Sequence, residues 1–224
     1  MRPRFLAALL VLLSTSLSGL AAGGVNATVK NAKGEPIADA VVSLVPLDHP
    51  VPPPSPQTAA VEIAQEDEQY QPFMTVVRTG TRVEFPNKDR IQHHIYSASE
   101  TKKFEKPLYA PGAREAIVFD QPGVVALGCN IHDWMAAYVV VLDTPWFART
   151  GAKGDARLSD IPPGRYRLDV WHPRQVGPDR RPARVPLSRE VTITDGAALA
   201  ESLTLTLAPE RRIRRTPANK SGNY

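Results

Sequence analysis

Gly128-Cys129-Asn130-Ile131-His132-Asp133-Trp134-Met135 is the most informative stretch of this 224-residue chain. It separates two apolar runs, Val124–Leu127 and Ala136–Leu142, whose composition is typical of β-strands. A thiol, an imidazole and a thioether therefore share one short connection between strands, with the spacing Cys-x2-His-x2-Met. All three groups coordinate transition metals, so this loop is a candidate metal site.

A second imidazole is available upstream, in Gln92-His93-His94-Ile95. Two His and one Cys in a trigonal arrangement, with a weak axial Met, make up the ligand set of blue-copper sites. The alternative is that Cys129 and Met135 are ordinary core residues and His132 lies on the surface, since free Cys is often simply buried. That alternative does not explain the offsets between the three residues, so the sequence predicts one bound copper ion.

The upstream ligand has two candidates, His93 and His94. If residues 92–97 form a strand, their side chains alternate between its two faces. Ile91, His93 and Ile95 then share the more apolar face, which would point into the core. His94 would lie outside, or contribute hydrogen bonds around the site. We therefore predict that His93 is the ligand.

The region from about Ala59 to Leu142 resembles the cupredoxins of the plastocyanin and amicyanin family. The resemblance is carried by Gly80-Thr81-Arg82-Val83-Glu84-Phe85 with Asn87, by His93, by Gly123 and by the loop described above. The compact Cys-x2-His-x2-Met spacing is similar to that of the amicyanins.

This resemblance implies a type 1 copper site with His93, Cys129, His132 and Met135 as ligands. It also implies a chain that transfers single electrons as copper cycles between Cu(II) and Cu(I). One position departs from the family pattern. In many cupredoxins an Asn directly follows the first His ligand and ties the two ligand loops together, whereas this chain has His94 there.

The flanking segments resemble a different fold. Lys33–Val42 (KGEPIADAVV) is similar to the opening of a carboxypeptidase-regulatory-like, transthyretin-type β-sandwich, and Leu158–Leu168 (LSDIPPGRYRL) is similar to its middle. The alternative is that Val25–Val45 only adds strands to the cupredoxin. The wider pattern, including Asp143-Thr144-Pro145-Trp146-Phe147, resembles exported proteins labelled methylamine utilisation protein.

The rest of the chain also predicts strands, and no long stretch has the 3.6-residue apolar period of a helix. Short apolar runs separated by Pro and Gly turns predict an all-β chain of sandwich architecture. The strands are expected at residues 25–30, 40–45, 59–65, 74–78, 81–85, 92–97, 116–119, 124–127, 136–142, 165–171, 189–194 and 202–207.

We therefore expect a cupredoxin Greek-key β-sandwich at residues 58–143, inserted in or next to a second, Ig/transthyretin-like β-sandwich. Residues 25–48 and 144–208 would build that second sandwich. The Pro-rich stretch His49–Gln57 and the segment Asp143–Thr150 are the expected connections, because an insertion is tolerated where its two ends lie close together. Residues 209–224 are basic and poor in apolar side chains, which predicts a flexible tail.

The N-terminus predicts export. A basic start at residues 1–4, an apolar run at Phe5–Leu13 and small residues near 19–24 are typical of a secretory signal peptide, which we place at residues 1–22. The apolar run is short for a membrane span, so we expect a periplasmic or otherwise exported protein without stable membrane insertion after cleavage. An uncleaved anchor is the alternative.

Composition excludes several other classes. The single cysteine rules out an internal disulfide framework and a multi-Cys zinc site. No basic face with interleaved aromatic residues is apparent, so we expect no nucleic-acid partner.

The expected function is electron transfer with a redox protein partner, an unidentified dehydrogenase or cytochrome. No enzyme activity is expected, because four protein ligands leave no open metal position for a substrate. His132, on the loop, would be the more exposed ligand and the exit for the electron. Two alternatives stay open: copper binding or delivery without a redox partner, and an enzyme that uses Cys129 as nucleophile and His132 as base.

Overall fold

The computed structural model describes residues 22–54, 60–179, 181–183 and 185–210. These residues form strands, turns and loops and contain no helix, so the all-β prediction is confirmed. Correspondingly, these ranges offer no helix that could cross a membrane. Most of the expected signal peptide and tail (residues 1–21 and 211–224) and the end of the Pro-rich connection (residues 55–57) lie outside them.

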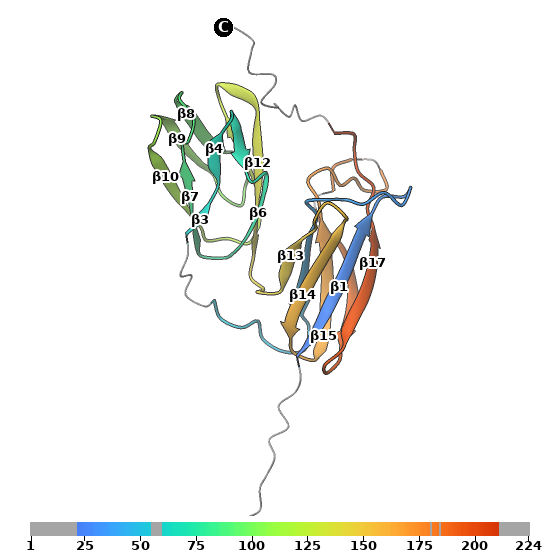
Figure 1. Cartoon of the computed structure of the whole chain (residues 1–224). Coiled ribbons are helices and arrows are strands. Elements are labelled where there is room, and N and C mark those ends of the chain that lie inside the picture. Colours follow the sequence, from blue (N-terminus) through green and yellow to red (C-terminus); the bar gives the residue numbers. More distant parts are fainter. Residues whose placement is uncertain (1–21, 55–59, 180, 184, 211–224) are drawn as a thin grey trace, which may run out of the picture.

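The strands build two β-sandwiches that lie side by side (Figure 1). The first contains a sheet with the order β10-β7-β3, a sheet with the order β6-β12-β11-β8-β9 and the separate hairpin β4-β5. Its strands are β3 (Val61–Glu62), β4 (Ala64–Glu66), β5 (Gln69–Gln71), β6 (Met74–Arg78), β7 (Thr81–Pro86), β8 (His93–Ser97), β9 (Phe104–Tyr109), β10 (Arg114–Phe119), β11 (Gly123–Cys129) and β12 (His132–Leu142).

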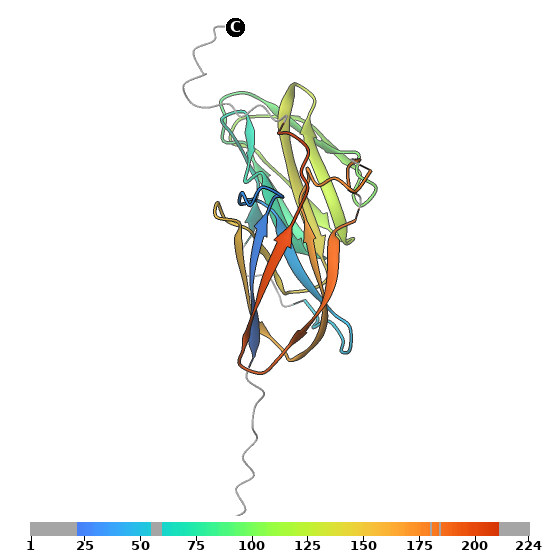
Figure 2. The same cartoon turned by 90° about the vertical axis from the view of Figure 1, so that its right-hand side faces the viewer.

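The second sandwich combines strands from both ends of the described chain (Figure 2). One sheet has the order β14-β1-β17 and the other has the order β13-β2-β15-β16. Its strands are β1 (Gly23–Lys30), β2 (Val41–Pro46), β13 (Phe147–Arg149), β14 (Asp155–Ile161), β15 (Gly164–Trp171), β16 (Leu187–Ile193) and β17 (Ala198–Thr204).

Strand pairing explains how the first sandwich can interrupt the second. Strand β1 pairs with β14 and β17, and β2 pairs with β13 and β15, so early and late segments share sheets. The chain leaves the second sandwich after β2 and returns at β13, where Phe147 lies opposite Ser43. Because the two connections start from neighbouring strands, the inserted segment needs no long return path. The expected domain boundaries themselves stay a prediction.

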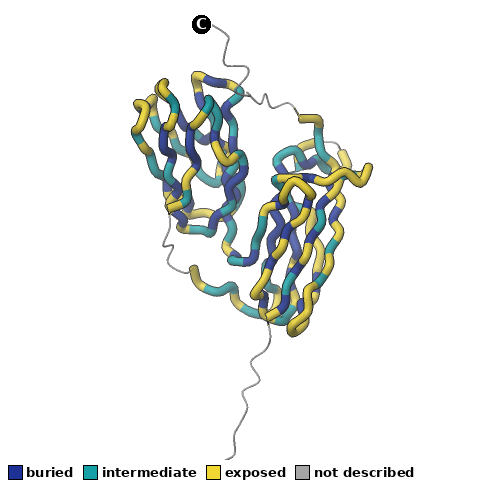
Figure 3. Tube along the Cα trace, in the orientation of Figure 1, coloured by how far each residue is buried: buried dark blue, intermediate teal, exposed yellow. Residues whose placement is uncertain are grey.

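Each sandwich has its own apolar core. Buried residues recur along the strands of both sandwiches (Figure 3). Alternation produces these cores: on β1, for example, Val25, Ala27 and Val29 are buried while the residues between them are more exposed. A third, smaller cluster forms where the two sandwiches meet, with Val41 from one and Met74 and Val140 from the other. Val140, on the outer face of β12, is therefore covered by the second sandwich, whereas the inner face of β12 belongs to the core of the first sandwich, where the site described next lies.

Candidate metal centre

Cys129 and His132 are brought together by the β11–β12 hairpin. They are cross-strand partners on either side of the two-residue turn at Asn130 and Ile131. Directly opposed residues point to the same face of a sheet, and the buried residues Val125 and Leu127 show that this face is the core. The Cys129 Sγ atom accordingly lies 3.8 Å from Nδ1 of His132.

Met135 reaches the same core because β12 is irregular at its start. Gly128 pairs with Ala136, but the next residue, Cys129, pairs with His132, so residues 133–135 have no counterpart on β11. Regular alternation would place His132 and Met135 on opposite faces, and the extra residues remove that conflict. Met135 is 2% exposed and packs in the same core cluster as Cys129.

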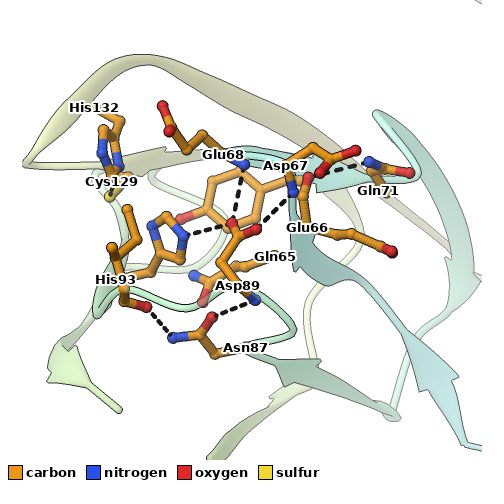
Figure 4. Close-up of polar contacts among 12 residues, drawn as sticks. Gln65, Glu66, Asp67, Glu68, Gln71, Asn87, Asp89, His93, Cys129 and His132 are labelled. Carbon is orange, nitrogen blue, oxygen red and sulfur yellow. Dashed lines mark hydrogen bonds and ion pairs between the residues drawn. The ribbon is translucent and has the colours of Figure 1, made fainter. Parts of the chain in front are cut away.

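His93 completes the group from the neighbouring strand β8. Its side chain is 0% exposed, and its ring centroid lies 5.0 Å from that of His132. One candidate ligand atom from each of His93, Cys129 and His132 lies within 4.8 Å of the other two. The structure thus brings three of the four predicted ligands close enough to share a single ion (Figure 4). The fourth, Met135, lies in the core cluster that includes Cys129.

The two nitrogens of His93 have different surroundings. Nε2 lies 2.7 Å from Oδ2 of Asp89, a distance at which the imidazole N–H donates to the carboxylate. Nδ1 is buried and has no hydrogen-bond partner among the described residues. An imidazole held by a carboxylate on one nitrogen, with its other nitrogen unsatisfied in a group of metal-binding side chains, fits a metal ligand.

His94 lies on the other face of β8, as expected from alternation, and does not belong to the metal-binding group. It is not exposed, however: its side chain is covered, with Nε2 2.9 Å from Oε1 of Glu105 and 3.4 Å from Nδ2 of Asn130. Asn130 is part of the loop that carries Cys129 and His132, so His94 contacts both ligand segments. The expectation that Ile91 points inward is wrong, because Ile91 lies in the bend before β8 and is 44% exposed.

The surroundings of Cys129 favour its thiolate form. Burial by itself raises the pKa of this thiol, but the His93 imidazole and the main-chain N–H groups of His94 and Ile131 outweigh burial and lower the pKa. Burial likewise acts to lower the pKa of His93, but Cys129 and Asp89 together raise it. A thiolate is the form of Cys that binds metals, so these effects fit a soft metal ion.

Tyr70, which the sequence analysis did not single out, ties the ligand segments together, and Trp134 of the ligand loop packs beside His132. The buried Tyr70 hydroxyl lies 2.9 Å from the carbonyl oxygen of His94 on β8 and 3.0 Å from that of Gly128 on β11, and can donate to either. The ring of Trp134 lies 5.1 Å from the ring of His132, and its Nε1 donates to the carbonyl oxygen of Glu68. No local motif marks Tyr70, because its partners lie far away in the sequence.

Gly128 has a steric role beside the site. A Cβ atom at this position would lie 2.8 Å from Cζ of Tyr96, which is closer than real contacts allow. Glycine therefore lets the Tyr96 ring of β8 cross over β11 next to Cys129. Gly128 and Tyr96 are also the residues that pair between β11 and β8, so the close approach lies where the two ligand-bearing strands meet.

Of the two imidazoles in the group, His132 is the more exposed, at 8% against 0% for His93. Its neighbour Ile131, at the tip of the hairpin, is exposed. His132 is thus the imidazole through which the group comes nearest to the surface, as expected from its place on the loop.

No protein-family model matches this sequence, and no curated protein matches it either. Among solved structures, a purple cupredoxin from Nitrosopumilus maritimus is 26% identical and covers 37% of this chain and 99% of its own, with a TM-score of 0.33. A copper(I) form of an amicyanin mutant is 17% identical and covers 37% of this chain and 82% of its own, with a TM-score of 0.35.

A copper-containing nitrite reductase from Thermus scotoductus is 23% identical and covers 44% of this chain but 25% of its own, with a TM-score of 0.37. These three structures are two cupredoxins and a copper enzyme, and each of them matches less than half of this chain. The transthyretin-type resemblance of the flanking strands and the methylamine utilisation label stay predictions.

Proposed function

We propose that this chain holds one copper ion in a type 1 site formed by His93, Cys129, His132 and Met135, and that it transfers single electrons between redox partners. The main support for this proposal is that the buried Nδ1 of His93 has no hydrogen-bond partner among the described residues and lies beside two other metal-binding groups. These are the Cys129 thiol, whose pKa is lowered, and the His132 imidazole. An unsatisfied buried polar atom is costly, and a bound metal would satisfy it. Two imidazoles, a thiolate and a thioether match copper better than zinc or a hard cation.

The residues would divide the work as follows. Cys129 would supply the thiolate, His93 and His132 the imidazole nitrogens, and Met135 a weak axial contact. Bound copper would supply a one-electron couple between Cu(II) and Cu(I). The chain's own contribution is rigidity: two ligands are fixed by a hairpin, a third lies on an adjacent strand, and Tyr70 ties the segments together. Such fixed ligands need little rearrangement when the metal charge changes.

The electron would leave through His132, because this imidazole lies nearest to the surface. The partner would be a redox protein, a dehydrogenase or a cytochrome, that docks at this end of the first sandwich. We further propose that the protein acts after export, in the periplasm or outside the cell, and that the copper-binding domain is inserted into the second sandwich. The strand pairing between residues 23–46 and 147–204 supports the inserted arrangement.

Catalysis by this chain alone is not part of the proposal. Four protein ligands would leave no open position for a substrate, unlike catalytic metal sites that keep one free. An enzyme with Cys129 as nucleophile would need an accessible sulfur, but Cys129 is buried in the core. Copper delivery uses the same ligands and is the second candidate. It predicts easy loss of Cu(I) to a chelator, whereas electron transfer predicts reversible reduction with the metal retained.

The test is to add Cu(II) to the purified metal-free protein and to record the visible spectrum. Copper should bind one-to-one and give the intense colour of a thiolate–copper bond. The variant Cys129→Ala should remain colourless under the same conditions, because the chain contains no other thiol. A colourless Cu(II) complex of the unaltered protein would refute the type 1 site.

A further inference from the structure

Asp89 connects the candidate metal centre to a hairpin turn on the neighbouring segment. It lies between β7 and β8, and its Oδ2 atom accepts a hydrogen bond from Nε2 of His93 over 2.7 Å (Figure 4). This contact places the imidazole proton on Nε2, so Nδ1 keeps a free lone pair, and Nδ1 is the atom that is buried without a partner. Asp89 therefore selects the tautomer in which His93 can bind a metal.

The same carboxylate also holds the turn between β4 and β5. Its Oδ1 accepts the main-chain N–H of Asp67 over 2.7 Å, and its Oδ2 accepts that of Glu68 over 2.9 Å. These two residues are the centre of a two-residue hairpin, with φ angles of 56° and 54°. Such turns normally carry Asn-Gly, because a residue with a Cβ atom is disfavoured at positive φ. The Asp89 carboxylate thus supplies hydrogen bonds that hold a turn whose own sequence does not favour it.

Asp89 is itself held in place. Its main-chain N–H donates to Oδ1 of the buried Asn87 over 3.1 Å. Nδ2 of Asn87 donates in turn to the carbonyl oxygens of Ile91, over 2.8 Å, and Tyr109, over 3.2 Å. The carboxylate is therefore a fixed junction between a ligand and a turn and not a mobile surface charge.

We propose that Asp89 is a positioning residue that couples His93 to the Asp67–Glu68 turn, so that metal binding and turn geometry stabilise each other. This inference rests on the proposed copper site. A metal on Nδ1 makes the Nε2–H a stronger donor, which strengthens its bond to the carboxylate. A carboxylate held more firmly also holds the turn amides more firmly. This coupling is reciprocal: the factor by which bound metal stabilises the turn contacts is also the factor by which those contacts strengthen metal binding. Loss of the Asp89 contacts must therefore weaken metal binding.

Four proteins test this coupling. Asp89→Asn keeps the shape of the side chain but leaves one acceptor oxygen for three N–H groups. Glu105→Gln is the matched control, because Glu105 makes the equivalent contact to His94, which lies outside the metal-binding group. The triple variant Asp89→Asn, Asp67→Asn and Glu68→Gly gives the turn a sequence that suits it without the carboxylate. The unaltered protein is the reference.

Four measurements are needed. They are Cu(I) affinity by competition with a chromophoric chelator, the visible spectrum with Cu(II), hydrogen exchange of the Asp67 and Glu68 amides with and without copper, and urea unfolding of the metal-free proteins. We expect Asp89→Asn to lower the affinity about 10- to 100-fold and to change the spectrum, as is usual when the carboxylate behind a ligating His is lost. Copper should slow exchange of the two amides in the unaltered protein and not in Asp89→Asn. Glu105→Gln should behave like the unaltered protein.

The triple variant separates positioning of His93 from support of the turn. In its metal-free form the triple variant should regain the unfolding stability that Asp89→Asn loses, but it should not regain the copper affinity of the unaltered protein. If Asp89→Asn alone does not fold, the triple variant is compared directly with the unaltered protein. Full recovery of affinity in the triple variant would overturn the inference, because Asp89 would then act through the turn alone. So would unchanged affinity in Asp89→Asn, or amide protection by copper that persists in it. Failure of the unaltered protein to bind copper would instead refute the proposed function, and the coupling with it.

Discussion

Replacing Tyr70 by Phe removes a single oxygen atom that links the two strands carrying the candidate ligands. The Tyr70 hydroxyl contacts the carbonyl oxygens of His94 on β8 and Gly128 on β11. Phe has the same ring, so the packing of this buried side chain is kept and no cavity opens. Burial also raises the pKa of Tyr70 far above its usual value, so the hydroxyl keeps its proton throughout the pH range in which the protein is handled.

The size of the effect follows from what the change leaves behind. A buried acceptor that loses its donor costs ~1–3 kcal/mol. The Tyr70 hydroxyl has one proton, which it shares between two carbonyls, and both carbonyls lose their contact with it in the variant. Gln65 Nε2 also reaches the His94 carbonyl, at 3.4 Å, and compensates in part. We therefore expect Tyr70→Phe to lower the free energy of unfolding by about 2 kcal/mol. Tyr109→Phe is the matched control. Tyr109 is also buried, but its hydroxyl donates to a single carbonyl, that of Phe85, so the change should cost about 1 kcal/mol.

Urea unfolding of the metal-free proteins, followed by tryptophan fluorescence, measures both values. The same variants loaded with copper report on the site: Tyr70→Phe should lower copper affinity, because its two carbonyls belong to the ligand segments, whereas Tyr109→Phe should not. A Tyr70→Phe protein as stable as Tyr109→Phe, or one with unaltered stability and affinity, would refute the role assigned to this hydroxyl.

Three further predictions follow from the site. His93→Ala should abolish the copper colour, because His93 belongs to the metal-binding group, whereas His94→Ala should keep the colour with at most a shifted spectrum. The opposite result would place the ligand on the other face of β8. Gly128→Ala should destabilise the protein by ~1–3 kcal/mol in urea unfolding, because the new Cβ would displace the Tyr96 ring, and a stable variant would contradict that contact. The purified copper protein should be reduced and reoxidised repeatedly without turnover of a small molecule, and an oxidase or hydrolase activity lost in Cys129→Ala would show that the chain is an enzyme.

Much of the fold could be predicted from alternation and turn residues, but four strands were not expected: β5, β9, β13 and β14. Strand β9 (FEKPLY) contains Pro107 and charged residues, and β14 (DARLSDI) alternates with charges. Both lie at the edge of their sheets, where Pro and charged side chains are tolerated because one side of the backbone stays unpaired. Strands of this kind show little apolar alternation in the sequence. They are recognised only in the structure, by their hydrogen bonds to the neighbouring strand of the sheet.

The candidate site likewise has features that the sequence predicts and features that only the structure shows. The sequence by itself determined that Cys129 and His132 lie in one short connection between two strand segments and therefore come close together. Only the structure shows that a two-residue turn makes them cross-strand partners. Alternation along β8 was likewise sufficient to separate His93 from His94, since neighbouring side chains in a strand point to opposite faces.

Only the tertiary structure decided how the group is held. Met135 faces the core because residues 133–135 of β12 have no counterpart on β11. The alternation of apolar residues in the sequence does not predict this irregularity. Asp89 reaches Asp67 across 22 residues, and Tyr70 reaches Gly128 across 58. Such contacts depend on how separate strands pack and not on the spacing along one strand. The physical reason is that a local pattern specifies which face a side chain occupies, whereas its hydrogen-bond partner is specified by whichever distant segment packs against that face.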